Sequence, residues 1–286
     1  MKKIFYIPSL LLLCLFSSCE KDADVELPEV KPKLVLAAFI TPQDTLLTVD
    51  VTRSQPIFQS YNVNTSAAVT DATVIMSGNS GSVQLNFDPD HQRYQAPASA
   101  LPIIPGNTYT LTVTTPLGES AHAETTVPYH NGVTGFSVDM QDSLTGDPFY
   151  SELHTTLTYY VTDYGGEENN YRFFSAILVR DTLTNDTISV RFINQLFTDG
   201  NRDGQQIQST LDGGWSDYDP AGSSRKVIGY DYWMFNVNND YYQLHNSFNN
   251  YAGSDPFSEP TLIYTNVFGG LGVFGAANGT KIRIYR

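Results

Sequence analysis

The sequence predicts a mainly β protein: an N-terminal immunoglobulin-like β-sandwich, followed by a β-rich second domain with one packed helix. Three observations support this fold class. Apolar runs and alternating apolar and polar residues recur along most of the chain, as in strands buried on one or both faces. Gly, Pro, Asn and Asp residues separate these runs at the short spacing of an antiparallel sandwich. One segment, near residue 240, has helical spacing instead.

Residues 1–18 have the pattern of a secretory signal peptide. Lys2 and Lys3 provide the positive start, and the apolar stretch after them is shorter than the roughly 20 residues of a membrane-spanning helix. The stretch ends in Leu15-Phe16-Ser17-Ser18-Cys19. This string resembles a bacterial lipobox, in which the cysteine is acylated and becomes the first residue of the mature chain. An ordinary signal peptide with a chance cysteine is the alternative.

The cysteine count agrees with a lipid anchor. The chain has two cysteines, Cys14 and Cys19. Cys14 would leave with the signal peptide and Cys19 would carry lipid, so no thiol would remain for catalysis, a disulfide or a metal. Removal of Lys2 and Lys3 changes the charge balance from 16 − 30 = −14 to 14 − 30 = −16. Such an acidic chain lacks the electrostatic character of a nucleic-acid-binding protein.

Residues 19–32 are expected to form an acidic, lipid-anchored tether. Its first residues, Glu20, Lys21, Asp22 and Asp24, resemble the acidic export signal of Bacteroidota lipoproteins. That signal directs lipoproteins to the outer face of the outer membrane. A generic polar tether is the alternative. The sequence therefore predicts an outer-membrane protein that is held by lipid and exposed at the cell surface.

Residues 33–128 contain the strands expected for the sandwich. They cover 34–40, 47–51, 72–77, 82–87, 92–96, 107–115 and 120–127. The first is a near-continuous apolar run, which is typical of a strand buried on both faces. Pro105 and Gly106 precede Tyr109, which resembles a tyrosine corner, where the hydroxyl bonds to the backbone a few residues upstream. We therefore expect Tyr109 to be structural.

Residues 129–286 are expected to form the second domain. Its strands are expected at 133–140, 153–161, 171–180, 186–192, 226–237, 261–268 and 281–285, with a long loop over 198–224. Asn238 or Asn239 can cap the one helix, and Gly253 can end it. The helix places four apolar residues on one face, which is expected to pack on a sheet: Tyr241, Leu244, Phe248 and Tyr251. The glycines after residue 268 are expected to form a kinked strand.

Specific motifs recur along nearly the whole mature chain. They are Lys33-Leu34-Val35-Leu36, Ile40-Thr41-Pro42, Asp71-Ala72-Thr73-Val74, the run 105–128, and the strings 255–260, 263–267 and 269–275. Together they resemble the Bacteroidota lipoprotein family called domain of unknown function 4249. The resemblance implies an outer-membrane lipoprotein that is often associated with TonB-dependent, SusC-like transporters. It supplies no catalytic residue.

No catalytic constellation stands out, so no enzymatic activity is predicted. The five histidines lack metal-ligand spacing. Gly78-Asn79-Ser80-Gly81 lacks the order of a nucleophile elbow. Carboxylates are abundant, so a hydrolase with a scattered acidic pair is a remaining alternative.

One string resembles the first half of a calcium loop. Asp199, Asn201 and Asp203 alternate before Gly204, so their oxygens can converge where glycine permits a sharp turn. Thr210 stands at the twelfth position, where such a loop has a bidentate glutamate. An ordinary polar turn is therefore the alternative to a calcium site, and no other cofactor is predicted.

The segment 198–224 also offers a candidate ligand surface at Trp215, Asp217 and Tyr218. Rings beside carboxylates suit a glycan or a peptide, because rings stack and polar groups fix the orientation of the ligand. Nearby, Tyr230 and Tyr232 alternate along the chain and are interpreted as one buried face of a strand.

These observations lead to one main functional hypothesis. The protein is expected to be a non-enzymatic surface lipoprotein that binds a nutrient or serves as an accessory subunit of a TonB-dependent, SusC-like transporter. A structural or adhesive cell-surface protein is the alternative.

Overall fold

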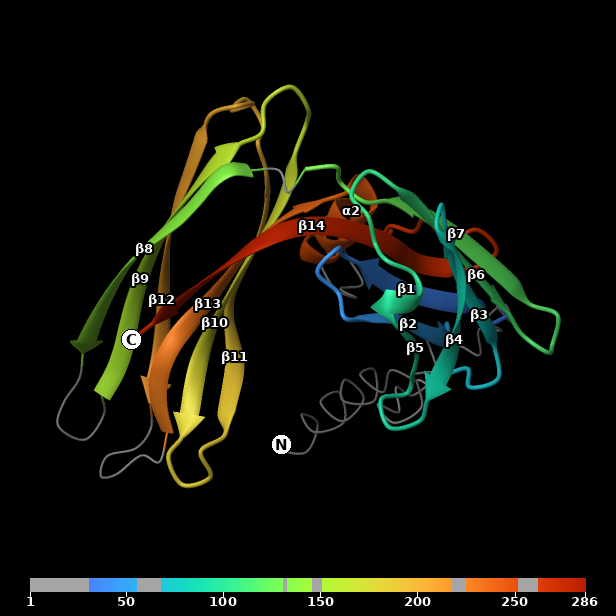
Figure 1. The fold of residues 1–286 in the computed structure, drawn as a ribbon, viewed down its shortest axis with the longest axis horizontal. Helices are drawn as coiled ribbons and strands as arrows, with labels where there is room; N and C mark the ends of the chain where they lie inside the picture. The colour runs from blue at the N-terminus through green and yellow to red at the C-terminus, as the bar shows by residue number, and fades with distance from the viewer. Residues whose placement is uncertain (1–30, 56–67, 131–132, 146–150, 218–224, 252–261) are drawn as a thin grey trace, which may run out of the picture. The chain divides into compact units, whose positions relative to one another are not determined.

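The structure is a computed structural model that describes residues 31–55, 68–130, 133–145, 151–217, 225–251 and 262–286 (Figure 1). The mainly β fold class is confirmed, and one α-helix occurs among these residues. The lipidation residue Cys19 and the export residues Glu20, Lys21, Asp22 and Asp24 lie outside the described residues, so their roles stay predictions. In the described ranges, no helix has the length and apolar character needed to cross a membrane.

The N-terminal half is an immunoglobulin-like sandwich around an aliphatic cluster. Its elements are β1 (Leu34–Ile40), β2 (Leu46–Arg53), β3 (Thr73–Gly78), β4 (Gly81–Asp88), β5 (Arg93–Pro97), η2 (Ala98–Ala100), β6 (Thr108–Thr114) and β7 (Ser120–Thr126). Alternate residues are buried in β1, β6 and β7, because successive side chains of a strand point to opposite faces. Leu36, Val49 and Val113 are fully buried. In β1 only one face is fully buried, although its apolar run predicts burial on both.

Tyr109 confirms the expected tyrosine corner. Its hydroxyl donates to the carbonyl of Pro102 at 2.8 Å and accepts from the N–H of Ile104 at 2.7 Å. The side chain is buried. It therefore secures the entry to β6 and is not available to a ligand.

The C-terminal half contains two layers of strands that enclose an aromatic cluster. Its strands are β8 (Val133–Thr145), β9 (Ser151–Asp163), β10 (Asn170–Asp181), β11 (Thr187–Thr198), β12 (Gln206–Asp217), β13 (Arg225–Val237) and β14 (Leu271–Tyr285). β12, β9 and β8 form one sheet, and β11, β10, β13 and β14 are neighbours in the larger sheet (Figure 1). Side chains of both layers fill the space between them. Tyr230 and Tyr232 are fully buried there, which confirms their interpretation as one buried face.

The last strand, β14, pairs with strands of both halves. Residues 271–276 run parallel to β1, and residues 277–285 run antiparallel to β13. Gly272 has a φ of +105°, and a Cβ added there would lie 1.9 Å from the carbonyl oxygen of Leu36. Only glycine fits this position. A strand through the C-terminal glycines is therefore confirmed, while the domain boundary expected between residues 128 and 129 stays a prediction.

The helix α2 (Asn239–Asn249) begins where the sequence predicts. The side chain of Asn238 accepts a hydrogen bond from the N–H of Tyr241 at 3.1 Å, which satisfies one of the helix's unpaired N–H groups. The ring of Tyr241 packs edge-on against Phe39 of β1, with the ring centroids 4.9 Å apart. The first turn of α2 is therefore fixed against the N-terminal strands.

The far end of α2 differs from the expected buried stripe. Leu244 is buried, but Phe248 and Tyr251 are 54% and 50% exposed. The packing of α2 is concentrated on its early turns, so the prediction of a fully buried stripe is wrong at these two residues. Gly253, the expected end of the helix, lies outside the described residues.

Two expectations for the later strands are wrong. β12 falls inside the long loop expected over 198–224 and pairs with β9 along its whole length. Its two consecutive glycines resemble turn chemistry, but they are tolerated because β12 is an edge strand. Conversely, the strand expected over 261–268 is reduced to an isolated bridge between Phe268 and His122.

Candidate metal centre

The loop from residue 199 to 205 joins β11 to β12 and carries the calcium-like string. Gly200 and Gly204 have φ values of +57° and +67°, a backbone region that suits glycine. The N–H of Arg202 donates to the carbonyl of Asp199 at 3.0 Å. The sequence thus folds here into a tight turn that directs its polar side chains to one place.

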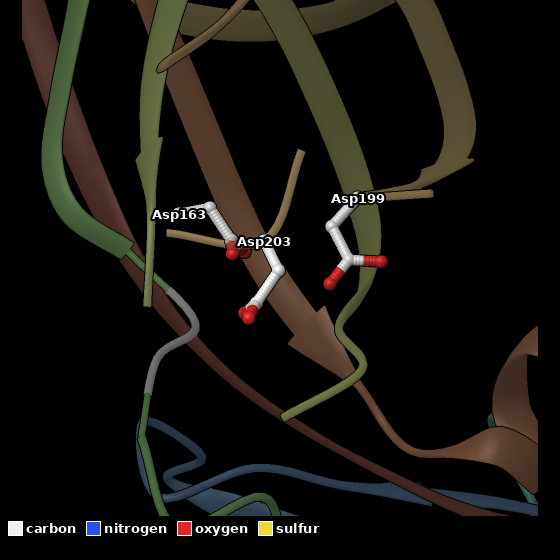
Figure 2. Close-up of side chains that lie close together, drawn as sticks. All are labelled: Asp163, Asp199 and Asp203. Carbon is white, nitrogen blue, oxygen red and sulfur yellow. The ribbon is translucent and has the colours of Figure 1, made fainter. Parts of the chain in front are cut away.

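Three carboxylates come together at this turn (Figure 2). Asp199 and Asp203 belong to the loop, and Asp163 is the last residue of β9. One oxygen of each lies within 4.8 Å of the others. Calcium binds oxygens at about 2.3–2.6 Å, so two ligands on opposite sides of one ion lie about 4.8 Å apart. The spacing is therefore compatible with one shared cation.

Asp163 is the most enclosed of the three carboxylates. It is buried, and it accepts hydrogen bonds from the N–H of Gly204 at 2.7 Å and from the hydroxyl of Tyr171. Burial, this hydrogen bond, and the charges of Asp163 and Asp199 all raise the pKa of Tyr171, since each disfavours the phenolate. Tyr171 therefore stays protonated and continues to donate to Asp163.

Backbone donors from the segment after β9 hold the other two carboxylates. The buried Asp199 accepts from the N–H of Asn169 at 3.1 Å. The exposed Asp203 accepts from the N–H of Gly166 at 2.7 Å. An ionised carboxylate offers about four lone pairs, so each group can accept further bonds. The arrangement fixes the loop and also presents acceptors to a cation.

The structure brings Asp199 and Asp203 together, as the resemblance to a calcium loop predicts. Sequence reasoning missed Asp163, which lies far from the string along the chain. The available signal was its place at the end of an alternating apolar run, directly before Tyr164 and two glycines. Such a position marks a polar group at the edge of a sheet.

The remaining positions of the string have different roles. Asn201 is exposed on the same turn. Thr210, at the twelfth position, lies on β12, where its hydroxyl is 2.9 Å from the hydroxyl of Thr158. Thr210 supplies no carboxylate, and the third carboxylate of the cluster comes from Asp163 on β9.

The candidate ligand surface of Trp215, Asp217 and Tyr218 lies largely outside the described residues. Trp215 and Asp217 lie on β12, opposite Leu153 and Ser151 of β9. Their side chains, and all of Tyr218, lie outside the described residues. The surface therefore stays a prediction.

Of the described histidines, His245 has a strongly shifted pKa. Its ring lies 5.6 Å from that of Phe39 and 4.4 Å from that of Tyr241, measured between centroids. Burial, helped by the positive charge of Arg172, lowers the pKa of His245 to about 4. The ring is neutral at physiological pH, and its stacking indicates a packing role.

Known proteins give limited guidance. No curated protein matches this chain. Among solved structures, the chain is similar to dimeric latent PorU from Porphyromonas gingivalis, with 14% identity and a TM-score of 0.14. The similarity covers 77% of this chain but only 19% of the PorU chain, so this chain spans about a fifth of the length of PorU. The likeness supports no functional argument. The family model described as domain of unknown function DUF4249 matches residues 20–283, and the chain therefore belongs to this family.

Proposed function

We propose that this protein is a lipoprotein of the outer membrane, exposed at the cell surface, and that it serves a TonB-dependent, SusC-like transporter. It acts there as a nutrient-binding or accessory subunit and performs no catalysis. Acylated Cys19 holds it in the membrane, and the acidic residues that follow direct its export. The β-rich body presents the ligand or transporter surface.

One observation carries the proposal: the family match begins at residue 20, directly after the predicted lipidation site. The leader before it has the charge, length and apolar character of a secretory signal. Several acyl chains on one residue give durable anchoring, whereas one chain binds a membrane marginally.

Anchoring is tested by labelling growing cells with a palmitate analogue. We expect the wild-type protein and a Cys14→Ala variant to incorporate the label, and a Cys19→Ala variant to lose it. Protease added to intact cells should then remove the wild-type protein. Protection of the protein until the cells are lysed would contradict surface exposure.

The transporter role is tested by affinity capture from solubilised outer membranes. A C-terminal tag on the acylated protein should recover a TonB-dependent barrel in repeated experiments. The Cys19→Ala variant controls for capture outside the membrane. Repeated recovery of the lipoprotein alone would contradict the accessory role and favour the adhesive alternative.

A further inference from the structure

The outward side of the strands β10, β13 and β14 concentrates positive charge. Tyr230 and Tyr232 of β13 face the aromatic cluster, so the residues that alternate with them face outward. The register places Arg283 beside Asp231, Lys281 beside Trp233, and Arg180 beside Lys226. We call the outward residues Arg180, Lys226, Lys281, Arg283 and Tyr285 the basic face.

All four cations of the basic face are solvent-accessible. Lys281 and Arg283 each keep 41% of their side-chain surface exposed, and Arg180 and Lys226 are also exposed. Among the described outward side chains of β10, β13 and β14, one is acidic, namely Asp231. Asp181, the last residue of β10, and Asp186, in the turn that follows, lie at one end. The face is therefore basic in a chain whose net charge is −14.

The opposite layer has a different composition. Strands β8, β9 and β12 contain no lysine or arginine. Their outward side includes Asp139 and the paired hydroxyls of Thr158 and Thr210. Among the described side chains of β8, β9, β10, β12, β13 and β14, the exposed positive charge thus lies on one side.

Asp231 holds two of these cations in fixed positions. It is 2% exposed, and it accepts from Arg283 at 2.5 and 2.6 Å and from Lys281 at 2.8 Å. Burial would raise the pKa of Asp231, but the two cations lower it overall. One carboxylate balances one of the two positive charges, so this pair of cations retains a net charge of +1.

Aromatic rings accompany the same cations. The Lys281 ammonium lies 4.7 Å from the centroid of the Trp233 ring, and the Arg283 guanidinium lies 6.0 Å from that of Tyr285. These contacts restrict the two long side chains before any ligand arrives. Tyr285 is 70% exposed, so its ring can stack on a ligand. The neighbouring guanidinium of Arg283 can then pair with a negative charge on the same ligand.

We infer that the basic face binds a linear polysaccharide that carries carboxylate groups. Side chains two residues apart on β14 lie about 7 Å from each other, which gives a row of cations that a polymer with repeated charges can follow. Sugar rings present flat C–H faces to Tyr285, and their carboxylates pair with the cations. The proposal rests on the nutrient-binding role above and names the class of nutrient.

Two features favour this ligand over other anions. Leu178, on the outward side of β10, is buried, so this leucine is not available for insertion into a lipid surface. The exposed ring of Tyr285 offers a stacking contact that inorganic polyphosphate does not use. The acidic remainder of the protein repels polyanions and confines binding to this face.

The test measures binding of polygalacturonate to the purified full chain in detergent. We expect saturable binding that weakens as salt is added, because salt screens exposed charges. The variant Arg180→Gln/Lys226→Gln should bind about tenfold more weakly, which corresponds to about 1.4 kcal/mol. Tyr285→Ala should also weaken binding. These three residues are exposed, and Asp231 keeps both of its partners, so the variants should fold.

The matched control is Lys31→Gln/Lys33→Gln, which removes the same charge at two exposed residues elsewhere. It should bind like wild type. Neutral dextran should not bind. Absence of polygalacturonate binding, or equal weakening by the control, would overturn the proposal. The proposal would also be overturned if polyglutamate, polyphosphate or anionic vesicles bound with equal affinity and Tyr285→Ala had no effect. The basic face would then attract polyanions of any kind through its charge alone. Transporter capture is measured separately, so the two proposals can fail independently.

Discussion

The two hydrophobic clusters of this fold bury different kinds of side chain. The cluster of the N-terminal half is mostly aliphatic, with Leu36, Val49 and Val113 fully buried. The cluster of the C-terminal half is richer in aromatic rings and includes the fully buried Tyr171 and Tyr230. Aliphatic side chains are stabilised by packing alone, whereas buried tyrosines, which are more frequent in the C-terminal cluster, also need partners for their hydroxyl groups.

Those partners make the aromatic cluster depend on polar groups around it. The hydroxyl of Tyr159 donates to Gln195 at 2.7 Å, and the hydroxyl of Tyr171 donates to Asp163 of the candidate metal centre. Packing and polar contacts are therefore coupled in the C-terminal half. The comparison teaches that the loop carboxylates, whatever they bind, also stabilise the neighbouring core.

The largest expected effect comes from the strand shared by the two halves. Phe274 of β14 is fully buried in the aliphatic cluster. Phe274→Ala should lower the free energy of unfolding by about 3–5 kcal/mol, because it removes a large ring and leaves a cavity. Urea unfolding measures this loss. Tyr285→Ala, on the same strand but exposed, should change stability by less than about 0.5 kcal/mol.

Calcium should stabilise only the aromatic half. At about 100 times its Kd, a ligand that binds the folded state alone adds about 2.7 kcal/mol. We expect added calcium to raise the melting temperature of the wild-type protein and to have no effect on Asp199→Asn. A wild-type melting temperature unchanged by calcium would show that the loop is an ordinary polar turn.

The Asp163→Asn variant tests the structural role of the loop carboxylates without added calcium. The substitution keeps the shape but removes the charge that accepts from Tyr171 and Gly204. We expect a loss of about 1.5–3 kcal/mol, the range for hydrogen bonds to charged groups, together with a changed near-ultraviolet tyrosine signal. Asp139→Asn, at an exposed position on β8, is the matched control. Equal stability of the two variants would contradict the coupling.

Acid should reveal a pH-dependent contribution of His245 to stability. Burial lowers its pKa to about 4 in the folded protein, from the ordinary histidine value of 6.5. The unfolded chain therefore binds a proton first, and stability is lost as the pH falls from 6.5 towards 4, by at most about 1.4 kcal/mol per pH unit. His245→Gln should flatten this part of the stability curve. Identical slopes for variant and wild type would contradict the assignment.

Local signals in the sequence predicted local structure well. The corner at Tyr109 and the helix cap at Asn238 each depend on residues a few positions apart, and both are confirmed. The position of Asp163 beside Asp199 depends on how β9 and β12 pair, which no short window of sequence contains. β12 was missed for a related reason, because the pairing with β9 overrides its turn-like glycines.

The parallel pairing of β1 with β14 has a consequence for the order of folding. The first strand of the fold finds one of its two neighbours in the last strand of the chain. During synthesis, one edge of β1 therefore stays open until residues 271–276 have emerged. Contacts between such distant residues form slowly, because the loop must close before they stabilise anything. A chain shortened within β14 would retain that open edge, which is a template for aggregation.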